Sequence, residues 1–167
     1  GRFGYHMATK MKEMKDQILG IDIKEEMVDQ CLPYVTNAQI ADATNENVIR
    51  SLGVRNFDVC IVTIADNFQA SLEVTSLLKD CGAKFVVSRA AGEVHAKFLL
   101  RNGADEVIYP EKDMAIHGAV KYSVDHVFDF FELTPQYSIY ETSVPNNWIG
   151  KNIVELQVRT KYHINIL

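Results

Sequence analysis

The first residues of the chain have the spacing of a phosphate-binding turn. Gly1-Arg2-Phe3-Gly4 matches the second half of a G-x-G-x-x-G turn, whose glycines let the backbone approach a pyrophosphate at a helix N-terminus. In such units an acid about 20 residues further on accepts hydrogen bonds from ribose hydroxyls. Asp22 stands at this spacing and ends the apolar run 17–21. Two glycines alone mark ordinary turns more often, but together with Asp22 they favour a nucleotide site.

The elements that would position this turn alternate between helix and strand. Phe3, Met7, Met11 and Met14 recur at spacings of three and four, which predicts an amphipathic helix whose positive dipole end points at the ligand. Five strand-like runs follow, ending near residues 22, 42, 64, 88 and 109 and separated by helical segments. This rhythm predicts an α/β fold, a Rossmann-like doubly wound parallel sheet with helices on both faces.

Polar side chains stand where these strands end. In an open α/β sheet this carboxyl edge is where ligands bind. Each of these residues could instead start a loop or cap a helix, and for any single one that interpretation is favoured. Together with the glycine turn they predict a nucleotide site. They are Asp22, Asp42, Asp66 with Asn67, Arg89 and Glu111.

The strand that should precede the glycine turn is missing from the sequence. In the strand order 3-2-1-4-5-6 it is the central strand, and its neighbours would share it as a partner. Without it, backbone groups in the middle of the sheet have no partner. We therefore expect a short apolar strand ending in Gly-x upstream of Gly1. Otherwise a strand from another chain fills the gap, or the sheet is split.

Composition excludes several classes of function. The net charge is −5 and no Lys/Arg stripe is present, which argues against a nucleic-acid partner. No apolar run approaches the ~18 residues that a transmembrane segment needs. Cys31, Cys60 and Cys81 are odd in number and lack C-x-x-C spacing, so we expect buried thiols in a reducing cytosol.

Including the glycine turn, the chain contains a series of family-level motifs in a fixed order: 1–4, 21–22, 41–44, 51–58, 67–71, 102–105 and 110–114. Together these seven segments resemble the RCK or KTN family, the cytoplasmic regulators of potassium channels and transporters, and most closely its Ktr-type A subunits. The resemblance covers nearly the whole chain and is far more specific than any one motif.

The resemblance implies roles for individual residues. Arg2 would pair with the γ-phosphate of ATP, Asp22 would hold ribose hydroxyls, and Asp42 would contact the adenine amino group. Glu111 would help to hold Mg²⁺ or Ca²⁺ at bound ATP, although spacing alone favours a helix N-terminal glutamate. The full implied nucleotide-binding set is Gly1, Arg2, Phe3, Gly4, Asp22, Ile23, Asp42, Ala43, Thr44, Asn67, Arg89 and Glu111.

The resemblance also implies a domain plan. Residues 1–123 would be the nucleotide-binding domain, 124–135 a crossover helix that packs on a partner subunit, and 136–167 the start of a small C-terminal subdomain. The rival interpretation of the apolar segment 124–133 is that it folds back on its own domain. Homodimers would assemble into a ring, expected to be an octamer, at the cytoplasmic face of the membrane on a potassium transporter or channel.

A regulator is favoured over an enzyme. A dehydrogenase needs a general acid or base beside the nicotinamide, and His117, His126 and His163 have no partner at triad or metal spacing. We find neither a P-loop lysine nor a Ser-His-Asp order. We therefore predict a module that senses ATP/ADP, with NAD/NADH as the alternative ligand pair and an NAD-dependent oxidoreductase as the alternative function.

Overall fold

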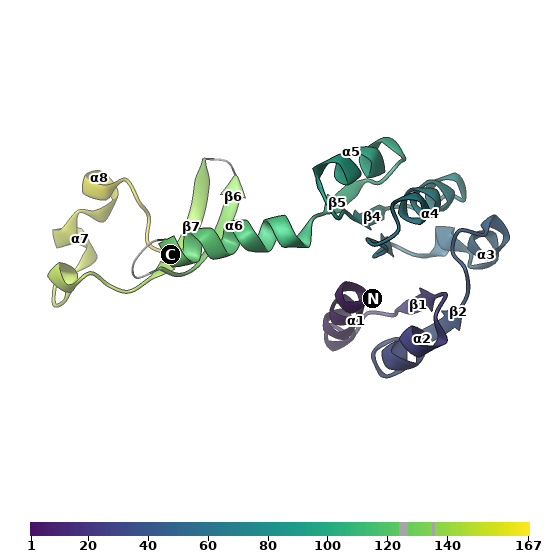
Figure 1. Cartoon of the computed structure of the whole chain (residues 1–167). Coiled ribbons are helices and arrows are strands. Elements are labelled where there is room, and N and C mark those ends of the chain that lie inside the picture. Colours follow the sequence, from purple (N-terminus) through teal and green to yellow (C-terminus); the bar gives the residue numbers. More distant parts are fainter. Residues whose placement is uncertain (124–126, 135) are drawn as a thin grey trace. The chain divides into compact units, whose positions relative to one another are not determined.

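The computed structural model describes residues 1–123, 127–134 and 136–167 (Figure 1). They form two compact units, residues 1–111 and 112–167.

The first unit alternates helices with short parallel strands, as the sequence predicts. The strands end within two residues of the predicted exits. In order, the elements are α1 (Arg2–Glu13), β1 (Leu19–Asp22), α2 (Glu25–Cys31), a 3-10 turn (Leu32–Tyr34), β2 (Asn37–Ile40), α3 (Glu46–Ser51), a 3-10 turn (Val54–Asn56), β3 (Cys60–Val62), α4 (Phe68–Asp80), β4 (Val86–Arg89), α5 (Glu93–Arg101) and β5 (Glu106–Ile108). Helix α6 (Pro110–Ser123) begins at the end of this unit.

The parallel sheet of this unit is split between β1 and β3. One part pairs β1 with β2, with Leu19 opposite Asn37. The other has the order β3-β4-β5, with Cys60 opposite Val86 and Val87 opposite Glu106. In Figure 1, β1 and β2 lie with α1 and α2, whereas β4 and β5 lie with α4 and α5. Within the residues described, the sheet is therefore divided at the position where the sequence analysis expects the central strand, and the expected upstream strand stays a prediction.

A cavity of about 800 Å³ lies between the two parts of the sheet. The facing strands β1 and β3 both line it, and Val74 and Leu78 of α4 contribute apolar side chains. Met7 and Met11 of α1 line it as well, whereas Met14 follows the end of the helix and is 67% exposed. The predicted apolar stripe is therefore correct for its middle and wrong at Met14.

The buried core lies beside this cavity. Its larger cluster joins α3, α4, β3 and β4 through residues such as Ile49, Val62 and Val86. Cys81 belongs to this cluster, while Cys31 and Cys60 are half-buried. All three thiols are free, and burial raises the pKa of Cys60.

The second unit contains an antiparallel hairpin of β6 (Val127–Thr134) and β7 (Tyr137–Thr142). The prediction of a helix over 124–135 is therefore wrong for residues 127–134, and its remaining residues lie outside the described ranges. Aromatic residues suit a strand, and Phe130 stacks between His117 of α6 and Tyr140 of β7. The helix that follows β5 is α6.

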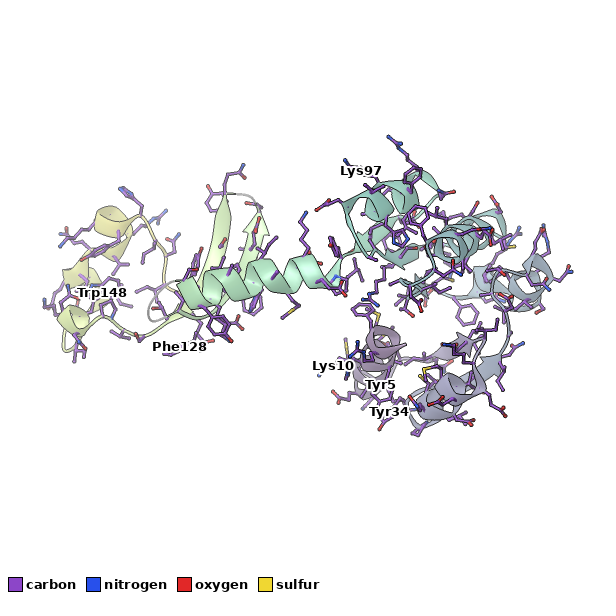
Figure 2. All side chains as sticks on the ribbon, viewed as in Figure 1. Tyr5, Lys10, Tyr34, Lys97, Phe128 and Trp148 are labelled. Carbon is purple, nitrogen blue, oxygen red and sulfur yellow. The ribbon has the colours of Figure 1, made fainter. Side chains whose placement is uncertain are left out.

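Short elements complete the second unit: a 3-10 turn (Asn146–Trp148), α7 (Ile153–Leu156) and α8 (Val158–Tyr162). A capping box of Asn152 and Glu155 begins α7. Trp148 packs on Tyr162 with ring centroids 5.3 Å apart, and Figure 2 labels this tryptophan. Among the described residues of the whole chain, no helix is long and apolar enough to cross a bilayer.

Candidate nucleotide site

The glycine turn begins helix α1 directly. Gly1 is the N-cap residue, and its carbonyl accepts a hydrogen bond from Tyr5 N at 3.0 Å. No side chain of the described residues caps this helix, and its first turn has no acidic residue, so its N–H groups and positive dipole end can serve an anion. Arg2 is the first helical residue and is exposed.

Two contacts hold α1 in place. The Tyr5 ring meets the Tyr34 ring edge-to-face at 5.1 Å, which ties the helix to the turn after α2 (Figure 2). On the other side, a Cβ atom added to Gly4 would lie 2.8 Å from Thr63 Oγ1, directly after β3. Gly4 therefore allows α1 to approach the end of β3 more closely than a residue with a side chain could.

Asp22 lies beside the turn, as the spacing predicts. Its Oδ2 is 3.6 Å from Gly1 N, and its Oδ1 accepts a hydrogen bond from Lys24 N at 3.0 Å. The carboxylate is thus oriented by its own loop, with one oxygen directed to the turn, where ribose hydroxyls would lie. The next residue, Ile23, is 63% exposed.

Asp42 follows β2 and is held by a local turn. Its Oδ1 accepts hydrogen bonds from the Thr44 hydroxyl at 2.7 Å and the Thr44 amide at 2.9 Å. Both bonds lower the pKa of Asp42, and the bond from the hydroxyl has the larger effect, so the carboxylate stays an acceptor. Ala43, between them, is half-buried. The N-cap of α3 is Asn45, whereas the Thr44 hydroxyl is bonded to Asp42.

Asn67 caps helix α4. Its Oδ1 accepts a hydrogen bond from Ala70 N at 3.0 Å. This is the helix-capping role that the sequence analysis left open beside nucleotide binding. The bond uses the amide oxygen, while the side-chain NH₂ is a separate donor that suits a phosphate oxygen.

Arg89 joins three elements of the site. It ends β4, its guanidinium carbon lies 5.5 Å from the centre of the Phe3 ring, and its Nη2 donates to Glu111 Oε1 at 2.6 Å. Glu111 is the second residue of α6. The pKa of Glu111 is held below its ordinary value, mainly by the residue's own backbone N–H and to a lesser extent by the Arg89 guanidinium. Residues from the glycine turn, β4 and α6 are therefore brought together.

Among the described residues, the predicted metal ligand Glu111 belongs to no larger cluster of metal-ligating side chains. No group of three or more His, Cys, Asp or Glu side chains with metal-binding geometry occurs in the described ranges. What the structure gives Glu111 is a helix N-terminal position and an ion pair with Arg89. Its role at a nucleotide-bound cation is therefore a proposal.

A network of buried polar residues lies next to Arg89, and it was not predicted from the sequence. Ser71, Thr75 and Ser88 are fully buried, and the hydroxyls of Thr75 and Ser88 lie 2.8 Å apart. His95 Nε2 lies 2.6 Å from Ser71 Oγ. The pairs are 13 and 24 residues apart in sequence, with no motif at that spacing, so only the packing of α4 on β4 and α5 reveals them.

These hydrogen-bonded buried residues also fix the loop that follows Arg89. Ala91 N donates to His95 Nδ1 at 3.1 Å, so His95 is neutral and carries its proton on Nε2, facing Ser71. Burial lowers the pKa of His95, which favours the neutral form. Arg89 therefore stands between two residues that hydrogen bonds hold: Ser88 through its buried hydroxyl and Ala91 through its backbone amide.

Comparison with known proteins identifies relatives over the whole chain. The chain is 40% identical over 167 residues to Ktr system potassium uptake protein A of Bacillus subtilis (strain 168), covering all of this chain and 75% of that protein. Among solved structures, the GsuK channel bound to NAD matches with a TM-score of 0.67 and 12% identity, over 92% of this chain and 28% of that one. GsuK bound to ADP matches with a TM-score of 0.59 and 11% identity, over 71% and 32%.

At these identities the GsuK structures show the fold alone, a Rossmann-like α/β arrangement. The family model of the TrkA-N domain matches residues 1–110, which contain the glycine turn and all five parallel strands. With the full-length similarity to the Bacillus protein, this match shows that the chain belongs to the TrkA-N domain family and is of the Ktr type.

Proposed function

We propose that this chain is a nucleotide-sensing regulatory subunit of a potassium uptake system and not an enzyme. The observation that carries the proposal is the convergence of the glycine turn, Asp22 and Arg89 at the carboxyl edge of the parallel strands. A carboxylate for ribose hydroxyls, a helix N-terminus for phosphates and a guanidinium beside them match the chemistry of an adenine nucleotide.

The ligand pair we favour is ATP and ADP, with NAD and NADH as the alternative. The Asp22 carboxylate suits ribose hydroxyls and repels a 2′-phosphate, which disfavours NADP. The relative GsuK has been solved with NAD and with ADP, which supports both candidates. Asp42, with Ala43 and Thr44, is proposed to contact the adenine ring, because its ionised carboxylate can accept from the exocyclic amino group.

Sensing requires that two ligands interact differently with two conformations. ATP offers a γ-phosphate that ADP lacks, and the exposed Arg2 at the first position of α1 is the cation proposed to pair with it. A cation here is disfavoured by the helix dipole, so an anionic partner would offset that cost. Glu111 is proposed to contact a Mg²⁺ or Ca²⁺ ion bound with ATP.

The proposed partner is a membrane potassium transporter, because the Bacillus relative is named as a potassium uptake protein. We propose that the chain acts at the cytoplasmic face of the membrane, as homodimers assembled into a ring. In this plan residues 1–123 bind nucleotide, the region around 124–135 contacts the partner subunit, and 136–167 begin a second subdomain.

The test is calorimetric titration of the protein with ATP, ADP, NAD and NADH, with and without Mg²⁺. Arg2→Ala should erase the preference for ATP over ADP and leave ADP binding nearly unchanged. Lys10→Ala removes a positive charge from the same helix and is the matched control (Figure 2). An unchanged ATP/ADP ratio in Arg2→Ala would exclude Arg2 as the sensor, and failure of all four compounds to bind would refute the proposed function.

A further inference from the structure

We propose that Arg89 and Glu111 form a latch that the phosphate group of a bound nucleotide opens. The inference rests on the proposed function and assigns to Arg89 a regulated exchange of partners. In the structure Arg89 donates a hydrogen bond to Glu111. When a nucleotide binds, its phosphate takes the place of the carboxylate, and Glu111 at the start of α6 loses that ion pair.

The pair has an asymmetric environment that favours exchange. The Arg89 side chain is 22% exposed, whereas that of Glu111 is 59% exposed. Glu111 therefore can turn to water at little cost, because its carboxylate already has solvent access. The guanidinium cannot, because burial leaves it dependent on an anionic partner within the site.

Arg89 has hydrogen-bonding capacity that Glu111 does not satisfy. A guanidinium has five N–H donors, and the bond to Glu111 uses Nη2. Its Nε is buried and has no hydrogen-bond partner in the part of the chain that the structure describes. A phosphate presents several acceptor oxygens and can bind a guanidinium through two of them, so it can replace the carboxylate and supply the missing acceptor.

The guanidinium already lies at the glycine turn. Its stacking on Phe3 places it beside α1, so the exchange requires a side-chain rotation and no movement of β4. Residues on either side are held by hydrogen bonds, Ser88 through its hydroxyl to Thr75 and Ala91 through its backbone amide to His95. Occupancy of the phosphate site is therefore transmitted by side chains to the first turn of α6.

The experiment is a double-mutant cycle read by calorimetric titration with ATP in a buffer that contains a chelator, which removes any role of Glu111 at a cation. Glu111→Gln keeps the side-chain shape and removes the competing charge. It should tighten ATP binding about 5-fold to 10-fold, within the range of ordinary coupling energies. Arg89→Gln should weaken ATP binding, and in that background Glu111→Gln should change it by less than about 2-fold.

Asp113→Asn is the matched control, because it removes the same charge two residues along α6. Equal tightening by Asp113→Asn, or by Glu111→Gln in the presence and absence of Arg89, would mean general charge repulsion and would overturn the latch. No change on Glu111→Gln in an otherwise normal ATP-binding protein would also overturn it, while the proposed function would stand. If wild-type protein bound no nucleotide, both proposals would fall.

A second readout needs no nucleotide. Hydrogen exchange at the amides of the first turn of α6 should be faster in both Arg89→Gln and Glu111→Gln than in wild type, and unchanged in Asp113→Asn. ATP should speed the same amides in wild type and have no further effect in Glu111→Gln. Protection that is equal in all four ligand-free proteins would contradict the latch.

Discussion

Substitution of Gly4 by alanine tests the close approach of α1 to the end of β3. In a free helix this change is stabilising by up to about 1 kcal/mol, because glycine is the poorer helix former. Here the new Cβ would lie 2.8 Å from Thr63 Oγ1 and 3.4 Å from Thr63 Cβ, so the helix or the strand end must shift. Such overpacking costs about 1–3 kcal/mol. We expect a net loss of about 0–2 kcal/mol.

Gly118→Ala is the matched control, since it adds a methyl group within α6, where the nearest atoms are those of the Tyr122 ring at 4.0 Å. This distance is ordinary van der Waals contact, so the variant should gain most of the ~1 kcal/mol helix-propensity term. The two identical substitutions should therefore differ by about 1–3 kcal/mol, in opposite directions relative to wild type.

Urea denaturation measures this difference, with separate probes for the two units because one transition need not describe both. Trp148, the single tryptophan, reports the second unit by fluorescence, and hydrogen exchange at α1 amides reports the first. Thr63→Ala in the Gly4→Ala background should restore most of the loss. Equal stabilisation by both alanines, or no rescue by Thr63→Ala, would refute the steric argument.

Two further predictions concern buried and capping groups of the first unit. The pKa of His95 in the folded protein lies below the unfolded value of about 6.5, so on acidification the unfolded chain binds the proton first. The contribution of His95 to stability should therefore be full above about pH 6.5 and should fall as the pH drops towards the folded pKa. The free energy of unfolding should decrease by up to about 1.4 kcal/mol per pH unit in this range. Hydrogen exchange at α5 amides between pH 7.5 and 5.5 measures this, and a slope that persists in His95→Gln would assign it to other groups. Asn67→Ala should cost about 1 kcal/mol of stability through loss of the α4 cap, whereas Asn67→Asp should keep the cap and weaken ADP binding by charge repulsion. Wild-type stability in Asn67→Ala, or unchanged ADP binding in Asn67→Asp, would show that this side chain lacks the corresponding role.

The order of elements was predictable because the local signals agree with the fold. Strand β3 lies in an apolar run rich in β-branched residues, which is typical of parallel strands. Glycines with positive φ, among them Gly82 and Gly103, follow the helices that the pattern predicts. The split sheet was also predictable, since the order of a doubly wound fold places the central strand before the glycine turn.

Errors arose where periodicity did not decide the structure. The apolar segment 124–133 predicts a helix that contacts a partner, but its described residues belong to β6 and pair across a hairpin with β7. The Thr44 hydroxyl could cap a helix or bond to Asp42, and only the turn geometry chooses the second.

The contacts of the candidate site are the least visible in sequence. Asp22 and the glycine turn were predicted together because a motif fixes their spacing. The pairing of Arg89 with Glu111, and of Ser71 with His95, depends on which helices pack side by side, and no local pattern contains that information.

The central claim is that the carboxyl edge of the parallel strands binds an adenine nucleotide. The most direct test is to map amide chemical-shift changes by NMR during a titration of the labelled 18.9 kDa protein with ADP. The account predicts saturable shifts at residues 1–5, 22–24, 42–44, 67–70 and 89–91. Shifts confined to residues outside these segments, or none at millimolar ADP, would contradict it.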